Sequence, residues 1–165
     1  MRASTSADIE GYASLFGVED QGRDIVMPGA FRASLAERGT ASIRMLFQHD
    51  PTQPVGVWDE IREDVRGLYV RGHLINGAAR ANEILTLLQG GALDGLSIGF
   101  RTRRAQRDHR TGRRRLFDID LWEISIVTFP MLPGARVSAM KSTMAGTVTS
   151  RALKGTCRTH PARAL

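Results

Sequence analysis

Two short segments of the sequence carry residue types that could together activate a hydroxyl nucleophile. GLSIGF at residues 95–100 contains Ser97, and FQHD at residues 47–50 contains His49. A serine hydroxyl is a poor nucleophile until a base takes its proton, and histidine has a suitable pKa for that task. The pair therefore indicates acyl-transfer chemistry such as peptide hydrolysis, provided that the fold brings the two side chains into contact.

Each of these residues also has a simpler interpretation. His49 could cap the turn that Asp50 and the following proline begin. Alternation along GLSIGF places Ser97 on the opposite face of a strand from its apolar neighbours, where an ordinary serine faces solvent. Gly95 and Gly99 weaken that interpretation, because neither favours a regular strand and both allow backbone and substrate to approach closely. The G-x-S-x-G spacing itself is a weak signal, since the hydrolase elbow leads into a helix and this segment continues as a strand.

A third group must orient the imidazole, and Glu123 in the segment LWEISIV is the first choice. An acid inside an apolar strand is costly to bury unless it has a partner. Its simpler interpretation is an outward-facing strand residue, since Ser125 shares its face. Asp50, Asp118 and Asp120 remain alternatives, because such triads are assembled in space and sequence spacing does not choose among them.

The elements that must position these residues are mostly strands. We expect helices over residues 28–39 and about 78–89, the second capped by Asn76, and strands over 9–17, 42–48, 55–64, 66–75, 92–100, 113–121 and 122–130. The strands lack regular helical crossovers. The order therefore favours a mainly β fold, a small and largely antiparallel β-barrel with peripheral helices.

Charge is distributed unevenly along the 165 residues, whose net charge is +6. We expect a globular domain over residues 1–137 and a basic, flexible tail over 138–165, which has no acidic residue. Residues 101–115 hold eight arginines and one aspartate, in a hairpin that turns at residues 108–112. This hairpin is a solvated loop, a contact for an acidic protein segment, or a phosphate-binding element; it has no aromatic residue for stacking on single strands.

Several other classes of protein do not fit the composition. No apolar run approaches the roughly 20 residues that span a bilayer, and the first residues lack the apolar stretch of a secretory signal. The single cysteine, Cys157, cannot form an internal disulfide, which favours the cytoplasm. No Cys/His cluster has metal-ligand spacing, so we expect no zinc and no cofactor.

Several blocks, in order, resemble those of the prohead (capsid maturation) proteases of tailed bacteriophages. The blocks lie within residues 9–140 and read IEGYASLFG, MPGAFRASL, FQHD with PVG, GLSIGF and LWEISIVTFPMLPGARV. That family consists of serine peptidases that are distantly similar in fold to the herpesvirus assemblins. The resemblance implies an assemblin-like β-barrel wrapped by helices.

The resemblance also implies roles for individual residues. The histidine of FQHD maps to His49, the serine of SIGF to Ser97 and the acid of the WEIS block to Glu123. The assemblins use a second histidine as the third member of the site, and the WEIS block of this chain contains none. Asp50, Asp118 and Asp120 therefore remain alternatives to Glu123 as the third member.

The function that the resemblance implies is a serine endopeptidase of capsid maturation. Such an enzyme cleaves scaffold and capsid-protein segments inside the immature capsid, in the cytoplasm of the bacterial host, and often cleaves itself; the tail would be an accessible site. The implied partners are the major capsid protein with its scaffold segment and further copies of the chain, without a membrane. The alternative is a non-catalytic capsid-assembly or nucleic-acid-binding protein that uses the hairpin at residues 101–115.

Overall fold

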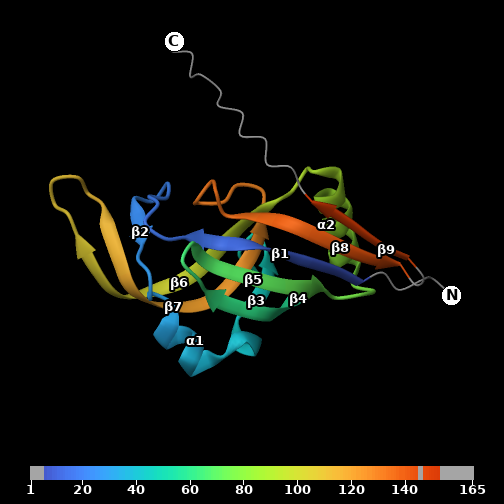
Figure 1. The fold of residues 1–165 in the computed structure, drawn as a ribbon, viewed down its shortest axis with the longest axis horizontal. Helices are drawn as coiled ribbons and strands as arrows, with labels where there is room; N and C mark the ends of the chain where they lie inside the picture. The colour runs from blue at the N-terminus through green and yellow to red at the C-terminus, as the bar shows by residue number, and fades with distance from the viewer. Residues whose placement is uncertain (1–5, 145–146, 153–165) are drawn as a thin grey trace, which may run out of the picture.

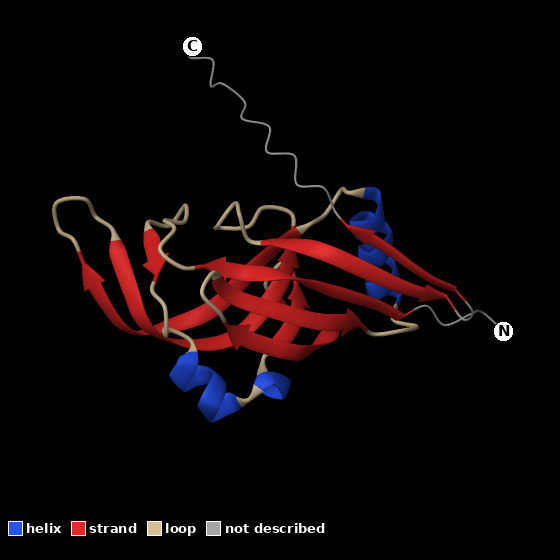
Figure 2. Ribbon diagram, viewed as in Figure 1, coloured by secondary structure: helices blue, strands red, loops and turns tan. Residues whose placement is uncertain are grey.

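Strands dominate the structure, a computed structural model that describes residues 6–144 and 147–152 (Figures 1 and 2). The described helices are α1 (Arg32–Arg38) and α2 (Ala79–Gly90), with a short 3-10 turn at Thr40–Ser42. The described strands are β1 (Ser6–Leu15), β2 (Asp24–Val26), β3 (Arg44–Phe47), β4 (Asp50–Glu63), β5 (Gly67–Leu74), β6 (Gly95–Arg107), β7 (Arg114–Val127), β8 (Arg136–Met144) and β9 (Thr147–Ala152).

Seven of these described strands close into a barrel. The order around the ring is β1, β5, β4, β3, β7, β6 and β8, and β8 pairs back with β1. The pairing within the ring is antiparallel except between β3 and β7. Outside the ring, β9 pairs with β8, and β2 runs parallel to the beginning of β7. The expected small, largely antiparallel barrel with peripheral helices is confirmed.

Strand β7 is the central element of the core and also positions the site. The apolar side chains that point inward are fully buried, in an alternating pattern that irregularities in register interrupt: Leu116, Ile119, Leu121, Ile124 and Ile126. Burying a side chain of this size contributes roughly 1.5–3 kcal/mol. The sequence pattern predicts two strands over residues 113–130, whereas the structure has one continuous strand. Helix α1 packs against this strand, where the buried Ser34 hydroxyl accepts the Leu121 N–H at 2.8 Å.

Both helices lie where periodicity predicts them, with different beginnings. Helix α1 starts after Phe31, whose N–H is bonded to the Glu63 carboxylate at 2.8 Å, rather than near residue 28. Helix α2 is not capped by Asn76: Ala78 holds the N-cap position, because Gly77, at φ 83°, turns the chain between Asn76 and the helix. Helix α2 ends close to the predicted residue 89, because Gly91 takes the left-handed conformation that closes the helix.

The arginine-rich hairpin forms the far ends of β6 and β7 and projects from the barrel (Figure 1). Its turn spans Asp108 to Gly112, as predicted, with the Gly112 N–H bonded to the Asp108 carbonyl at 2.8 Å. Some of its charge is paired with the body, through Arg103 with Glu37, Arg113 with Glu19 and Arg114 with Asp24. These ion pairs connect the hairpin to the rest of the domain. Its contact with an acidic segment or with nucleic acid stays a prediction.

The sheet continues past the boundary that the composition predicts at residue 137. Strand β8 crosses this boundary and pairs with β1, and β9 pairs with β8 as far as Ala152. The physical reason is an alternating pattern that one irregularity in register shifts by a residue, so that Val137 and Met140 are buried while Ser138 and Lys141 are exposed. The prediction of a tail rested on composition, because this segment has no acidic or aromatic residue, and it did not take this pattern into account. The predicted flexible tail beyond residue 152 lies outside the described residues.

Candidate active site

His49 lies in a two-residue turn between β3 and β4, where the backbone is strained. Gln48 and His49 have φ values of 55° and 59°, in the left-handed region that non-glycine residues rarely adopt. Two consecutive positive φ values between paired strands are typical of a type I′ hairpin turn. Each such residue costs on the order of 1–3 kcal/mol unless its surroundings hold it.

Strand β7 and the residue that follows it hold this turn in place. The Gln48 N–H donates to the Ile126 carbonyl at 3.0 Å, and the Gln48 side chain exchanges hydrogen bonds with Thr128. The His49 N–H donates to the Ser125 hydroxyl at 3.1 Å. His49 is therefore a turn residue, as the simpler interpretation expected, and it is also fixed against the neighbouring strand.

The three residues proposed from the sequence lie in one hydrogen-bonded row. His49 Nε2 lies 2.9 Å from Ser97 Oγ, and His49 Nδ1 lies 2.6 Å from Glu123 Oε1. Ser97 belongs to β6 and Glu123 to β7, which pair antiparallel, while β3 delivers His49 from the other side of β7. Strand pairing thus brings together residues that are 48 and 74 positions apart in the chain.

The three side chains differ in their exposure to solvent. Ser97 is 5% exposed, the Glu123 side chain 12% and the His49 side chain 42%. The simpler interpretation of Ser97 as a solvent-facing residue is therefore wrong, because the His49 side chain lies against its hydroxyl. The arrangement presents an open imidazole above a buried hydroxyl and a partly buried acid.

Two small residues position the acid. The Ser125 hydroxyl donates to Glu123 Oε2 at 2.6 Å while it accepts the His49 N–H. Gly99 faces Glu123 across the β6–β7 pairing, and a Cβ at that position would overlap the Glu123 carboxylate. Gly99 therefore makes room for the acid, whereas the sequence suggested room for a substrate.

Ser125 is the residue that sequence reasoning missed. It is fully buried, although its shared face with Glu123 suggested an exposed pair. The available signal was its spacing, because residues two apart on a strand point to the same side and can bond one another.

The electrostatics of the row favour a charged imidazole. The hydrogen bond that His49 donates to Glu123 raises the pKa of His49 above its ordinary value, and partial burial opposes that rise. A carboxylate at Nδ1 can only accept a hydrogen bond, so Nδ1 carries the ring proton and Nε2 is free to accept the proton of Ser97. The row can therefore accept a proton from the hydroxyl and stabilise the imidazolium that forms.

The alternative acids do not contact His49. Asp50 accepts two hydrogen bonds from within its own turn, and these bonds lower its pKa. Asp120 is bound by the Arg38 guanidinium, which holds the pKa of that carboxyl far below its usual range. Asp118 has a buried oxygen without a hydrogen-bond partner, and no contact of Asp118 with His49 exists among the described residues. Glu123 alone of the four lies against the imidazole.

Metal ligands and membrane-spanning helices are absent from the part of the chain that the structure describes. No group of three or more His, Cys, Asp or Glu residues there could hold a metal ion. No helix within residues 6–144 and 147–152 has the length and apolar character needed to cross a membrane.

Comparison with known protein sequences gives a consistent result. A family model described as caudovirus prohead serine protease matches residues 1–150. The prohead protease of Enterobacteria phage HK97 is 42% identical over 137 residues, which cover 81% of this chain and 60% of that relative. The prohead protease of Escherichia phage T5 is 27% identical over 135 residues, 81% of this chain and 63% of that relative. This chain thus spans less than two thirds of the length of either relative.

Solved structures show the same architecture at low sequence identity. The capsid assembly protease of bacteriophage T4 has a TM-score of 0.62 and 14% identity, over 74% of this chain and 82% of that one. The KSHV protease in complex with a hexapeptide phosphonate inhibitor has a TM-score of 0.53 and 10% identity, over 84% of this chain and 65% of that one. The varicella-zoster virus protease has a TM-score of 0.50 and 17% identity, over 81% of this chain and 63% of that one. These likenesses concern the fold and confirm the expected assemblin-like barrel.

Proposed function

This chain belongs to the caudovirus prohead serine protease family, and from that membership we propose that it is a serine endopeptidase that cleaves scaffold and capsid-protein segments during prohead maturation. The observation that carries the proposal is the row of hydrogen bonds that joins Ser97, His49 and Glu123. A hydroxyl, a base and an acid in this order form the arrangement by which unrelated folds activate a serine.

The geometry gives each residue a role in peptide hydrolysis. His49 Nε2 accepts the proton of Ser97 as Ser97 Oγ attacks the peptide carbonyl. Glu123 holds the Nδ1 proton in place and stabilises the imidazolium, which then gives its proton to the leaving amine. Water, activated by the same imidazole, hydrolyses the acyl-enzyme and releases the second product.

The partners and the location follow from the family. We propose that the major capsid protein with its scaffold segment is the substrate, that the reaction takes place inside the immature capsid in the host cytoplasm, and that the chain also cleaves itself. Copies of the chain confined in one capsid would meet at high local concentration, which is the condition under which a homo-oligomer would form.

Coexpression with the major capsid protein of the same phage tests the proposed activity. Ser97→Ala and His49→Ala should each reduce the cleavage rate by roughly 10⁴-fold or more, because each removes a member of a unit that acts together. His73→Ala is the matched control and should cleave at close to the wild-type rate. Cleavage by Ser97→Ala at the wild-type rate, measured from the masses of the capsid protein, would contradict the assignment.

A further inference from the structure

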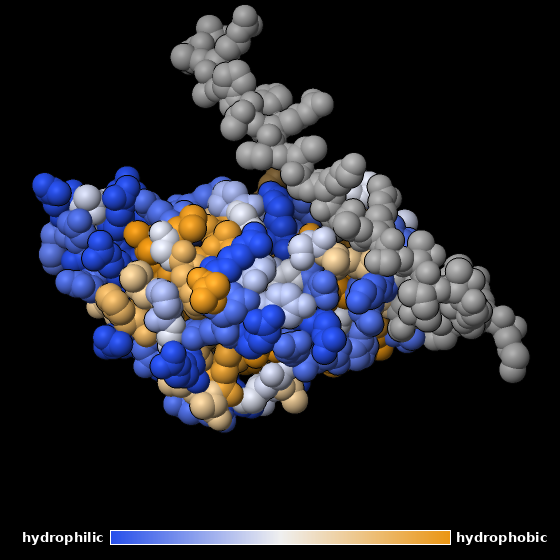
Figure 3. Space-filling view, in the orientation of Figure 1, coloured by the Kyte–Doolittle hydropathy of each residue, from blue (hydrophilic) through white to orange (hydrophobic). Residues whose placement is uncertain are grey.

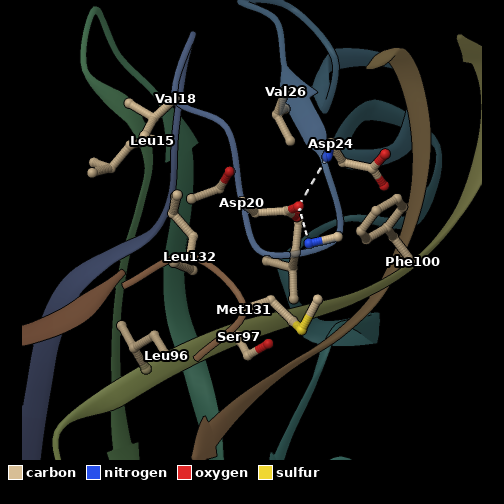
Figure 4. Close-up of a pocket in the computed structure, with 14 residues that line it drawn as sticks. Leu15, Val18, Asp20, Asp24, Val26, Leu96, Ser97, Phe100, Met131 and Leu132 are labelled. Atoms are coloured by element: carbon tan, nitrogen blue, oxygen red, sulfur yellow. Dashed lines mark hydrogen bonds between the residues drawn. The ribbon is translucent and has the colours of Figure 1, made fainter. Parts of the chain in front are cut away.

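A cavity of about 140 Å³ lies beside the nucleophile (Figure 4). Ser97 is part of its lining, and Asp20 lines it in the segment between β1 and β2. Figure 4 shows these two residues on different sides of the cavity, with Met131 between them. Apolar side chains form much of the remaining wall, including Leu15, Phe100, Met131 and Leu132. On the surface, Figure 3 shows apolar side chains gathered beside β2 and flanked by hydrophilic ones.

The cavity opens where β6 lacks a neighbouring strand on one side. β6 pairs with β7 from Gly95 to Arg107, whereas it meets β8 only through Gly95 opposite Arg136. An extended peptide can add to such an edge through its main chain, with alternate side chains entering pockets on one face. A peptide placed there with a carbonyl at Ser97 would have an adjacent side chain at the mouth of the cavity.

Asp20 brings a negative charge to the cavity. The nearby Arg114 guanidinium attracts this charge but forms its ion pair with Asp24. Its Oδ1 accepts the N–H groups of Gly22 at 2.8 Å and Asp24 at 2.9 Å, which fixes the carboxylate in place. Arg114 binds both oxygens of Asp24, and no basic side chain of the described residues forms an ion pair with Asp20. Burial raises the pKa of Asp20, while the two backbone N–H groups and the nearby Arg114 oppose that rise.

We propose that this cavity receives the side chain of the substrate residue whose carbonyl Ser97 attacks, and that Asp20 selects a lysine at that position. The apolar walls match the methylene stem of a lysine, whose ammonium group would reach the carboxylate. This inference rests on the proposed function and adds the class of substrate to it.

Lysine fits the carboxylate better than arginine does. A guanidinium group binds a carboxylate best through two parallel hydrogen bonds to both oxygens. Two backbone N–H groups already occupy Oδ1 of Asp20, so one oxygen remains fully available. An ammonium group acts as a compact point charge and needs only that oxygen. An acidic substrate residue would meet like charge and would be excluded.

A peptide library prepared from a denatured proteome tests this specificity directly. The wild-type chain should cut after lysine. For matched peptides with lysine or norleucine at that position, kcat/KM should favour lysine by roughly 10- to 100-fold. Asp20→Asn keeps an acceptor for the two N–H groups and removes the charge, and it should reduce this ratio to within about threefold. Asp20→Lys should shift the cut sites toward glutamate.

Asp108→Asn is the matched control for the loss of an acid that accepts turn N–H groups. Asp108 binds the N–H of Arg110 at 2.9 Å in the turn of the hairpin, outside the cavity. This variant should keep the lysine preference, and thermal unfolding should show that it and both Asp20 variants fold. A wild-type chain that cuts after other residues, or a lysine preference that survives in Asp20→Asn, overturns the inference.

A binding measurement separates this inference from the proposed activity. If the wild-type chain cuts no peptide, the proposed function fails, and the cavity is then tested with Ser97→Ala by nuclear magnetic resonance. N-acetyl-lysine amide should shift the backbone amide signals of Gly22 and Asp24, and Asp20→Asn should abolish that shift. An equal response to N-acetyl-norleucine amide, or no response to either compound, overturns the lysine site.

Discussion

The barrel carries two exposed histidines that look alike in their first contacts. His49 Nδ1 lies 2.6 Å from Glu123, and His73 Nδ1 on β5 lies 2.9 Å from Asp59 on β4. Their side chains are 42% and 37% exposed. Neither exposure nor contact with a carboxylate therefore distinguishes a candidate base from an ordinary surface histidine.

The difference lies in what surrounds each pair. His49 has Ser97 at its second nitrogen, whereas the structure shows no such bond for His73 among the described residues. The Glu123 side chain is 12% exposed and is bonded to Ser125, while the Asp59 side chain is 43% exposed. A buried and fixed carboxylate orients an imidazole, because water competes with it less for hydrogen bonds.

The largest expected difference between the two pairs comes from neutralising each acid. Glu123→Gln should reduce kcat by roughly 10³- to 10⁴-fold, because an amide can stabilise the wrong tautomer of His49 and cannot stabilise its cation. Asp59→Asn is the matched change and should alter kcat by less than about twofold. Both are measured on a peptide that spans a mapped cut site. An equal loss in the two variants would remove the distinction between the pairs.

A methyl group at Gly99 should disturb the His49 pair without removing any of its members. Gly99→Ala forces the Glu123 carboxylate to move, and a misplacement of about 1 Å can cost on the order of 100-fold in rate. We expect a loss of roughly 10- to 100-fold in kcat, and overpacking should lower the free energy of unfolding by about 1–3 kcal/mol. Peptide cleavage and denaturant unfolding measure the two effects.

Gly90→Ala is the control for that change. A Cβ at Gly90 would meet no atom within 4 Å, and the residue lies at the end of α2. Its activity should equal that of the wild type. If Gly99→Ala is as active as this control, Glu123 is not held as tightly as the contacts indicate.

Removal of the Ser125 hydroxyl should have a smaller effect on rate. Ser125→Ala deletes the hydrogen bond to Glu123 and leaves the His49 N–H without its acceptor. We expect roughly a 10-fold loss in kcat with little change in KM, and a free energy of unfolding that is lower by about 1–3 kcal/mol. The exposed Ser138, which donates to the Glu10 carbonyl at 3.2 Å, is the control, and Ser138→Ala should change stability by less than about 0.5 kcal/mol. A fall in stability with no fall in kcat would show that Ser125 supports the barrel rather than the pair.

The smallest expected effect is a shift in pH dependence. Because Glu123 raises the pKa of His49, and the reaction needs the neutral imidazole, kcat/KM should rise with pH through a pKa above the ordinary value of about 6.5. In Glu123→Gln, the rise of the residual kcat/KM with pH should occur at lower pH than in the wild type. In Asp59→Asn, this rise should occur at the same pH as in the wild type. If kcat/KM of the wild type rises through an apparent pKa below 6.5, the contact with Glu123 is contradicted.

The same raised pKa affects stability in the opposite direction. A protonated His49 is favoured in the folded chain, so its contribution to stability is fully present below about pH 6.5. That contribution is lost as the pH rises through the higher pKa of the folded state. Activity should therefore increase over the pH range in which this part of the stability disappears, which denaturant unfolding at several pH values can measure.

Much of the architecture was predictable because its signals are local. Alternation along the segments that form β1, β5 and β6, and periodicity in α2, depend on neighbours a few residues apart. The residue types of His49 and Ser97 also indicate the chemistry without any knowledge of the fold. The sheet beyond residue 137 was missed, since a short stretch of small residues pairs only because β1 offers it a partner.

The residue types alone establish which groups could act: an imidazole, a hydroxyl and a set of candidate acids. The folded chain selects Glu123 among those acids, places Ser125 and Gly99 against it, and brings Asp20 and Ser97 to one cavity. The physical reason is that strand order and register join residues tens of positions apart, and a register shifted by one residue would turn each side chain to the other face.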